Sequence, residues 1–309
     1  MEFKYTCLVC GHNGSITEVK GIKDWEYGGT TEFEYRRCAS CGQVQMYPFL
    51  SMDELALVYP ETYVPHVQTS SARGALYNFL FSIKNKLILK NFRNMISKGA
   101  KVIDIGCGNG DFLMSLKSLG VSHLEGVDFS DRAVALATSK GIKAHKGIFL
   151  DVSLPNGEFD VAIMNYYLEH VVDPLAELRK VRAILKPGGF LFGEVPNFAS
   201  WDRIISGRFW GGNHIPRHTF QYEPETLRKL FLKAGFKKAE ITCVLDTGAM
   251  AMSVQNWLMR KKVDAGEIPQ LENGRIWGYN FLLFLMIPIG VLFFMFGRSG
   301  ILRFKASVE

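Results

Sequence analysis

The stretch Lys101-Val-Ile-Asp-Ile105, followed at once by Gly106-Cys-Gly-Asn-Gly110, decides the fold of this chain. The first five residues have the apolar character of a short buried strand, and the residues after the glycines, 111–117, have the pattern of a helix. A strand, a glycine-rich turn and a helix in this order are typical of a ligand site at the edge of a parallel sheet. The segment therefore predicts an α/β fold with a ligand at the glycine turn.

The spacing of the glycines restricts the ligand. A dinucleotide fingerprint, GxGxxG, requires glycine at position 111, where this chain has Asp111. A carboxylate at a helix N-terminus would repel a pyrophosphate, so a ligand that carries an amino acid and a ribose but no phosphate fits better. The next expected strand, 124–128, ends in Asp128, where a carboxylate can bind ribose hydroxyls. The alternative is that Asp128 only caps a helix, but Ser130 is better placed for that role.

The rest of the central region alternates between apolar strand patterns and helical patterns. We expect strands at 159–164, 189–195 and 236–244, and helices at 173–185 and 223–234. Lys186-Pro-Gly-Gly189 is expected to end a helix before the next strand. The pattern predicts a doubly wound sheet whose ligand lies beyond the carboxyl ends of the strands.

In its central region the chain resembles the class I S-adenosylmethionine-dependent methyltransferases. The matching segments are Val102-Ile-Asp-Ile-Gly-Cys-Gly-Asn-Gly110, Gly126-Val-Asp-Phe-Ser130, Phe159-Asp-Val-Ala-Ile163, Leu168-Glu-His170 and Leu185-Lys-Pro-Gly-Gly-Phe-Leu191. They have the order and spacing of that family and cover about residues 73–245. The resemblance implies a Rossmann-like methyltransferase sheet and S-adenosylmethionine as cofactor.

The resemblance also implies which residues bind the cofactor. Asp104 and the backbone of the glycine loop would hold its methionine part, Asp128 its ribose, and Ile148 with Phe149 its adenine. The full implied set is Asp104, Gly106, Gly108, Gly110, Asp128, Phe129, Ile148, Phe149 and Asn165. The family often has an acid in the Gly147 region for the adenine amino group, where this chain is apolar.

Methyl transfer to a hydroxyl or an acidic carbon requires an aligned acceptor and a base that removes its proton. The candidate bases are His218, which we favour, His170 and His214, with Glu169 beside His170. Arg217 could bind an anionic acceptor or hold a loop carbonyl. Each histidine taken alone also has the alternative of a purely structural hydrogen-bonding residue.

Two comparisons with methyltransferase subfamilies narrow the chemistry. Some quinone-pathway O-methyltransferases resemble this chain around Leu168-Glu-His170 and hold a divalent metal with an acid three residues before that glutamate. This chain has Tyr166 there, so we expect no catalytic metal. Nucleic-acid amino methyltransferases usually show Asn-Pro-Pro-Tyr where this chain reads Asn165-Tyr-Tyr-Leu168, which disfavours nucleic acid as a partner.

The N-terminal segment carries two CxxC pairs, each followed by glycine, and the four cysteines are Cys7, Cys10, Cys38 and Cys41. Two such knuckles supply the four thiolates that structural zinc prefers. Disulfides are the alternative, but the chain shows no secretion signal, and we expect a reducing cytoplasm. His12 is expected outside the ligand set, and Cys107 and Cys243 are expected to pack in the interior.

Residues 276–297 carry no charge and are almost entirely apolar. Because Gly300–Lys305 reads as a last edge strand that returns to the sheet, we expect Thr247–Ser299 to be an insertion that dips into or lies on an anionic membrane surface, bent at Pro288. A basic amphipathic helix at 73–95 is expected beside it. The alternative is that both segments pack on each other or form a homodimer interface.

The composition suits a folded enzyme: 48% of the 309 residues are hydrophobic, and the net charge of +6 falls short of a dedicated nucleic-acid coat. The expected division is a zinc ribbon at 1–49, a linker at 50–72, the methyltransferase domain at 73–246, the apolar helical insertion at 247–299 and a final strand at 300–309. We expect a cytoplasmic, peripheral or monotopic methyltransferase whose acceptor is a small molecule, a glycan or a lipid-linked compound. The alternatives are an RNA methyltransferase that grips its substrate with the ribbon, and a cofactor-binding module without catalysis.

Overall fold

The computed structural model describes residues 5–59, 95–267 and 275–309 of the chain. Most of the expected linker, from residue 60 onward, and nearly all of the expected basic helix at 73–95 lie outside the described residues.

The larger of two sheets has seven strands in the order β10-β11-β8-β7-β4-β5-β6. The strands β8, β7, β4, β5 and β6 are parallel, and β11 pairs antiparallel with both β8 and β10. Their bounds are β4 Lys101–Ile105, β5 His123–Asp128, β6 Lys143–Lys146, β7 Phe159–Asn165, β8 Leu185–Pro196, β10 Lys238–Val244 and β11 Ile301–Ser307. The expected doubly wound α/β sheet is confirmed.

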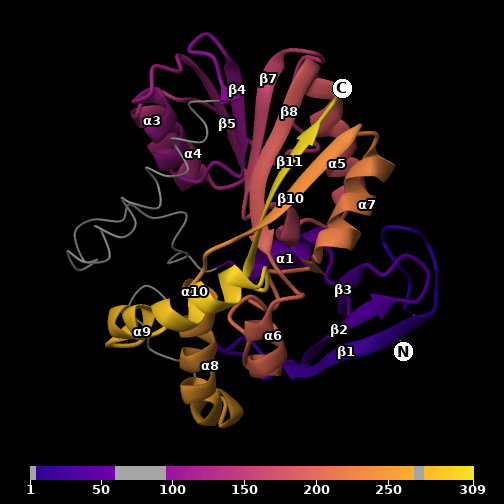
Figure 1. Cartoon of the computed structure of the whole chain (residues 1–309), viewed down its shortest axis with the longest axis vertical. Helices are drawn as coiled ribbons and strands as arrows, with labels where there is room; N and C mark the ends of the chain where they lie inside the picture. Colours follow the sequence, from indigo (N-terminus) through magenta and orange to yellow (C-terminus); the bar gives the residue numbers. More distant parts are fainter. Residues whose placement is uncertain (1–4, 60–94, 268–274) are drawn as a thin grey trace.

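Helices cover both faces of this sheet (Figure 1), with α3 Asp111–Lys117 and α4 Asp131–Ser139 on one side, and α5 Pro174–Ile184 and α7 Pro224–Ala234 on the other. Alternate residues of β4 show the two cores. Val102 packs in the cluster that contains Leu113 of α3, whereas Ile103 packs in the cluster that contains Leu178 of α5. Both faces are apolar because a parallel sheet of this kind is buried on both sides.

The start of β8 differs from the expectation. The helix α5 ends at Ile184 and β8 begins immediately at Leu185, so the expected stop at 186–189 lies inside the strand. In the pairing of β7 with β8, Phe159 lies opposite Leu185 and Val161 lies opposite Phe190, so β8 has extra residues between these two pairs. Gly188, with φ of +77°, allows this irregularity because the left-handed region favours glycine.

A second, antiparallel sheet has the order β1-β2-β3-β9. Three strands come from the N-terminal segment, namely β1 Ser15–Ile22, β2 Phe33–Cys38 and β3 Val44–Tyr47. The fourth, β9 Phe220–Gln221, comes from the long segment between β8 and α7, which also contains the helix α6 Trp201–Ser206 and a 3-10 turn at Gly207–Phe209. A short helix, α1 Met52–Leu57, follows β3. The two halves of the chain therefore share one sheet.

The residues between β10 and β11 form α8 Gly248–Asp264, α9 Tyr279–Leu285 and α10 Ile287–Met295, which gather at one end of the large sheet (Figure 1). Within the apolar run the helix is interrupted at Met286, which separates α9 from α10, and Pro288 lies in the first turn of α10. Among the described residues, no helix combines the length and the apolar character needed to span a bilayer.

Candidate active site and metal centre

The glycine loop after β4 has a backbone that only glycine accommodates. Gly106, Gly108 and Gly110 have φ values of +76°, +52° and +77°. A Cβ atom on Gly106 would lie 2.6 Å from the ring of Tyr167. The amides of Gly106 and Cys107 donate to the carbonyl of Val127, which fixes the loop on β5. The loop lies at the carboxyl edge of the sheet, the position at which ligands bind in open α/β folds.

Asp128, the last residue of β5, is fixed beside this loop. Its Oδ2 accepts the amide of Gly108 and its Oδ1 accepts the amide of Ser130, both at 2.9 Å. Ser130 itself caps α4 by accepting the amide of Ala133. The capping role therefore belongs to Ser130, and Asp128 holds the loop instead.

Asp104 lies at the other side of the loop and is buried. Burial, and to a lesser degree the charge of Asp128, raises the pKa of Asp104 to about 8. A buried carboxyl next to a second acid is stabilised in its ionised form by a cationic group. The amino acid part of S-adenosylmethionine offers an ammonium group, so the site fits this cofactor.

The other expected cofactor residues differ in exposure. Phe129 and Ile148 are 44% and 37% exposed at the carboxyl edge, and Asn165 ends β7. The side chain of Phe149, by contrast, is 1% exposed and belongs to the hydrophobic core.

Lys180 of α5 holds this segment, although no sequence motif marks it. Its Nζ donates to three backbone carbonyls, those of Phe149, Leu150 and Val152, at 2.5, 2.8 and 2.6 Å. An ammonium group has three donors, and these contacts use them all.

His170, His214 and His218 come together at the same edge. The ring of His218 lies 4.6 Å from that of His170 and 4.9 Å from that of His214, centroid to centroid. Nδ1 of His218 lies 2.9 Å from the carbonyl oxygen of Gly212, which can only accept, so Nδ1 carries the proton and Nε2 has the lone pair. Burial lowers the pKa of His218 well below its usual value, and the two other histidines add to this effect. His218 is therefore a neutral imidazole at neutral pH.

Glu169 lies beside His218, with 4.0 Å between Oε1 and the imidazole Nε2. Its carboxyl group is fully buried, and neither oxygen has a hydrogen-bond partner among the described residues. Burial raises the pKa of Glu169 to about 8. Glu169, His170 and His218 place polar atoms within 4.8 Å of one another, but we assign no metal to this group.

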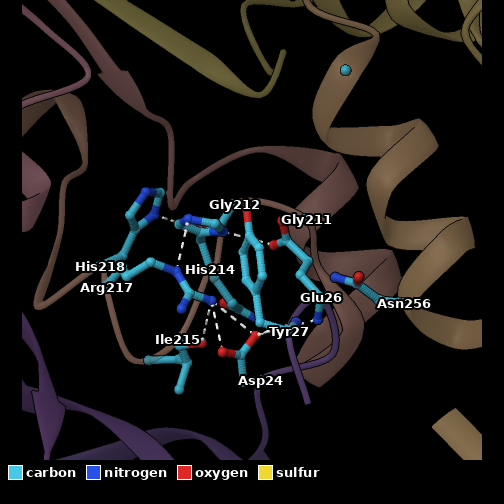
Figure 2. A network of polar contacts seen from close by, with 12 residues as sticks. Asp24, Glu26, Tyr27, Gly211, Gly212, His214, Ile215, Arg217, His218 and Asn256 are labelled. Carbon is cyan, nitrogen blue, oxygen red and sulfur yellow. Dashed lines mark hydrogen bonds and ion pairs between the residues drawn. The ribbon is translucent and has the colours of Figure 1, made fainter. Parts of the chain in front are cut away.

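His214 differs from His218 because both of its ring nitrogens are engaged (Figure 2). Nδ1 lies 2.7 Å from Oε1 of Glu26, and Nε2 accepts from Nε of Arg217 at 3.0 Å. Arg217 is fully buried and its Nη2 donates to both oxygens of Asp24. Of the two readings of Arg217, these contacts favour the structural one over the binding of an anionic acceptor.

Tyr59 connects the cofactor side of the site to the histidines. Its ring lies 5.4 Å from that of Phe129, and its hydroxyl lies 3.0 Å from Nδ1 of His170. Tyr166, the residue in place of the metal-binding acid, donates its hydroxyl to Glu194 at 2.8 Å, and Glu194 accepts from Arg303. No local sequence pattern points to Tyr59, Asp24 or Glu26 as residues of this site.

The four N-terminal cysteines form the second site. Their sulfur atoms lie within 4.8 Å of one another, with 3.6 Å between Cys7 and Cys41 and between Cys10 and Cys38. The knuckles have matching hydrogen bonds, from Gly11 to the carbonyl of Cys7 and from Gly42 to that of Cys38. Four sulfur donors at this separation suit a tetrahedral zinc ion. His12 is exposed and not part of the group.

Comparison with known proteins decides the family. Residues 76–241, more than half of the chain, match a family model described as a methyltransferase domain. The chain belongs to the class I S-adenosylmethionine-dependent methyltransferases. The match leaves out residues 1–75 and 242–309, which include the cysteine knuckles and the apolar helices.

Among curated relatives, this methyltransferase is 30% identical over 158 residues to the ubiquinone biosynthesis O-methyltransferase of Paraburkholderia xenovorans, which covers 46% of this chain and 67% of the relative. It is 26% identical over 172 residues to the demethylmenaquinone methyltransferase of Staphylococcus saprophyticus, covering 47% and 74%. A solved structure, Phospholethanolamine N-methyltransferase 2 of Haemonchus contortus, superposes with a TM-score of 0.54 at 15% identity, covering 91% of this chain and 70% of that one. The structural match shows the fold.

The buried carboxyl of Glu169 predicts a pH-dependent stability. The unfolded chain loses this proton near the ordinary glutamate pKa of about 4.3, whereas the folded protein keeps it up to about 8. The free energy of unfolding therefore falls as pH rises through this window. Glu169→Gln removes the effect, so its stability relative to the wild type should rise by more than about 1 kcal/mol between pH 5 and pH 9 in urea unfolding.

Glu225→Gln is the matched control, because Glu225 is an exposed glutamate of α7 that pairs only with Arg228 among the contacts described. Its stability relative to the wild type should not change with pH. A constant difference between Glu169→Gln and the wild type over the same range would show that Glu169 does not hold its proton.

Proposed function

We propose that this methyltransferase transfers the methyl group to a hydroxyl or a carbon of a small-molecule, glycan or lipid-linked acceptor at a membrane surface, with His218 as the base. The observation that carries the proposal is the unprotonated Nε2 of His218, fixed by the carbonyl of Gly212 beside the buried Glu169. The bound cofactor supplies a methyl group on a positively charged sulfur. The chain supplies the orientation of the acceptor and a place for its proton.

The cofactor residues are proposed from the geometry of the glycine loop. Asp104 would hold the ammonium group of the methionine part, the backbone of the glycine loop would lie along that part, and Asp128 would hold the ribose. Phe129 and Ile148, both exposed at the carboxyl edge, would flank the adenine, and Asn165 completes the set.

The role of His218 follows from the contacts of the three histidines. Glu26 and Arg217 occupy both nitrogens of His214, and Tyr59 contacts Nδ1 of His170. On His218, Nδ1 is occupied, and Nε2 lies beside the carboxyl of Glu169 at a distance longer than a hydrogen bond. Proton transfer from the acceptor to Nε2 would convert the neutral imidazole of His218 into an imidazolium.

The apolar helices support the membrane part of the proposal. Large side chains of this region are exposed to an extent that is unusual for a soluble surface: Trp277 101%, Phe281 64%, Phe284 53%, Met295 74% and Phe296 63%. Ile204 and Ile205 of α6 are also exposed, at 61% and 74%, and Trp201 packs against Phe293 of α10. Lys261, Lys262 and Arg298 lie at the ends of these helices, where they suit anionic headgroups.

Of these helices, α10 lies at the carboxyl edge of the large sheet, where β10 ends. A Cβ on Gly290 of α10 would lie 2.8 Å from the carbonyl oxygen of Asp246, so the helix packs tightly on the segment after β10. The charge of Asp246 in turn contributes to the raised pKa of Tyr166, after burial and the charge of Glu194. An acceptor with a lipid part would therefore enter from the apolar side. The relatives named for quinone pathways also act on small molecules, by their names.

We also propose that Cys7, Cys10, Cys38 and Cys41 bind one structural zinc ion. Cys38→Ser should lose the metal and lower the melting temperature, because a ribbon this small depends on its metal. Cys243→Ser, a control outside the group, should keep one zinc per chain by elemental measurement. The assignment would be contradicted if the purified wild-type protein contained no zinc. It would also be contradicted if the Cys38→Ser variant kept the full metal content.

Methyl transfer is tested with methyl-labelled S-adenosylmethionine and separate small-molecule, lipid, glycan and RNA fractions. We expect label in the small-molecule, lipid or glycan fraction and a loss of about 100-fold or more in His218→Ala, the range of a general base. His218→Ala should bind the cofactor as the wild type does in calorimetry. Asp128→Ala is the complementary variant and should lose affinity for the cofactor by more than about fivefold.

Each alternative has its own result in this experiment. Label in RNA would favour an RNA methyltransferase, and cofactor binding without any labelled product would favour a non-catalytic module. Unchanged transfer by His218→Ala would remove His218 as the base.

Membrane binding is tested by flotation with vesicles that contain phosphatidylglycerol. The double variant Phe281→Asp with Phe284→Asp should bind the vesicles at least about tenfold more weakly, because each phenylalanine contributes about 1.5–3 kcal/mol when buried. Leu232→Asp on α7, which is 50% exposed, is the matched control and should float like the wild type. A wild-type dimer that the double variant abolishes, with no flotation, would support the homodimer interface instead.

A further inference from the structure

The loop between β1 and β2 lies against the segment that carries the histidines (Figure 2). We propose that Glu26 and Asp24, from the N-terminal segment, are positioning residues for His218 and act through His214 and Arg217. This inference rests on the proposed role of His218 as the base. It assigns a part in the active site to a segment that the family match does not cover.

Glu26 fixes the protonation of His214. Nε2 of His214 accepts from Arg217, and a guanidinium has only donors, so Nε2 carries no proton. The proton is therefore on Nδ1, which donates to Oε1 of Glu26 at 2.7 Å. Glu26 is buried, with 7% exposure, so a water molecule from bulk solvent does not readily replace its carboxylate as the acceptor of the Nδ1 proton. One glutamate and one arginine thus hold His214 in a single tautomer and orientation.

Asp24 fixes Arg217 in the same way. Nη2 of Arg217 lies 2.8 Å from both oxygens of Asp24, and Nη1 donates to the carbonyl of Val58 at 2.9 Å. A fully buried guanidinium requires a counterion, since the loss of hydration is otherwise uncompensated. Oδ1 of Asp24 also accepts the amides of Glu26 and Tyr27, so the turn that presents Glu26 depends on Asp24.

The backbone of His214 transmits these contacts to His218. His214 has a φ of +39°, a conformation that is unfavourable for a residue with a side chain. Its carbonyl accepts the amides of Arg217 at 3.0 Å and of His218 at 3.2 Å. The contacts of the His214 ring therefore stabilise an unfavourable turn, and this turn places Nδ1 of His218 within hydrogen-bond distance of the carbonyl of Gly212. Without Glu26 we expect this turn to relax.

Several charged or titratable groups face the two rings and affect the measurement. His170, Arg217 and Glu169 face His218 together with His214. Tyr27 and His170 face His214 together with Glu26. These groups are unchanged in the variants below, so a difference between variants reports on Glu26.

The test is the tautomeric state of the histidines, measured by long-range proton–nitrogen NMR on full-length protein labelled with ¹⁵N-histidine, between pH 6 and pH 8. In the wild type we expect His214 and His218 to be neutral with the proton on Nδ1. Glu26→Ala should lose the single tautomer of His214 and shift the signals of His218. Glu26→Gln should retain the wild-type pattern, because its side-chain oxygen still accepts the Nδ1 proton.

Asp264→Asn is the matched control, because it breaks the 2.8 Å ion pair between Lys23 of the same loop and α8 without contact to His214. It should leave both histidines unchanged. Wild-type His214 with its proton on Nε2 would overturn the proposal, even if Glu26→Ala does not fold. Unchanged histidine signals in folded Glu26→Ala, or a Glu26→Gln spectrum like that of Glu26→Ala, would also overturn it. The measurement uses no acceptor, so a failure of methyl transfer is a separate result.

Discussion

The pairing of β9 with β3 is the contact on which the acceptor side of the site depends. It is short, with Val44 opposite Gln221 and Gln45 opposite Phe220, and the amide of Met46 extends it by donating to the carbonyl of Thr219. The segment before β9 carries His214 and His218 and is buried, so its backbone groups need partners within the protein. The N-terminal segment supplies some of these partners, since the hydroxyl of Tyr35 lies 2.9 Å from the carbonyl oxygen of Asn213 and 2.8 Å from that of His218. The proposed cofactor residues belong to the large sheet, whereas the positions of the histidines depend on both sheets.

Buried charge separates the structural residues of the site from the reactive ones. Arg217 is fully buried but every contact described for it is with an acceptor or an aromatic ring, which is the condition for a stable buried cation. Glu169 and Asp104 are buried next to groups that do not neutralise them, and their raised pKa values reflect this. Carboxyl groups left in this state cost stability, and such positions are concentrated at functional sites. Glu169 lies beside the proposed base, and Asp104 lies beside the cofactor loop.

Local sequence patterns were sufficient for the part of the fold that is proposed to bind the cofactor. The strands β4, β5 and β7, the helix α3 and the glycine loop are contiguous segments whose apolar runs and turns specify them without reference to distant residues. The four cysteines are likewise two local knuckles. The beginning of β8 was missed because Pro187 and two glycines are typical of a helix end, while pairing with β7 extends the strand through them.

The acceptor side could not be read in this way, because its contacts join residues far apart in the chain. Glu26 and His214 are separated by 188 positions, Asp24 and Arg217 by 193, and Tyr59 and His170 by 111. From the sequence, His218 is favoured over His170 and His214, but all three lie in loops that follow a strand, and no local pattern shows what each imidazole contacts. Only the tertiary contacts distinguish them: a carboxylate and a guanidinium occupy His214, while a single carbonyl orients His218. The choice of His218 as the base therefore depends on the contacts that the neighbouring histidines make. For His214, one of these contacts comes from Glu26 in the N-terminal segment.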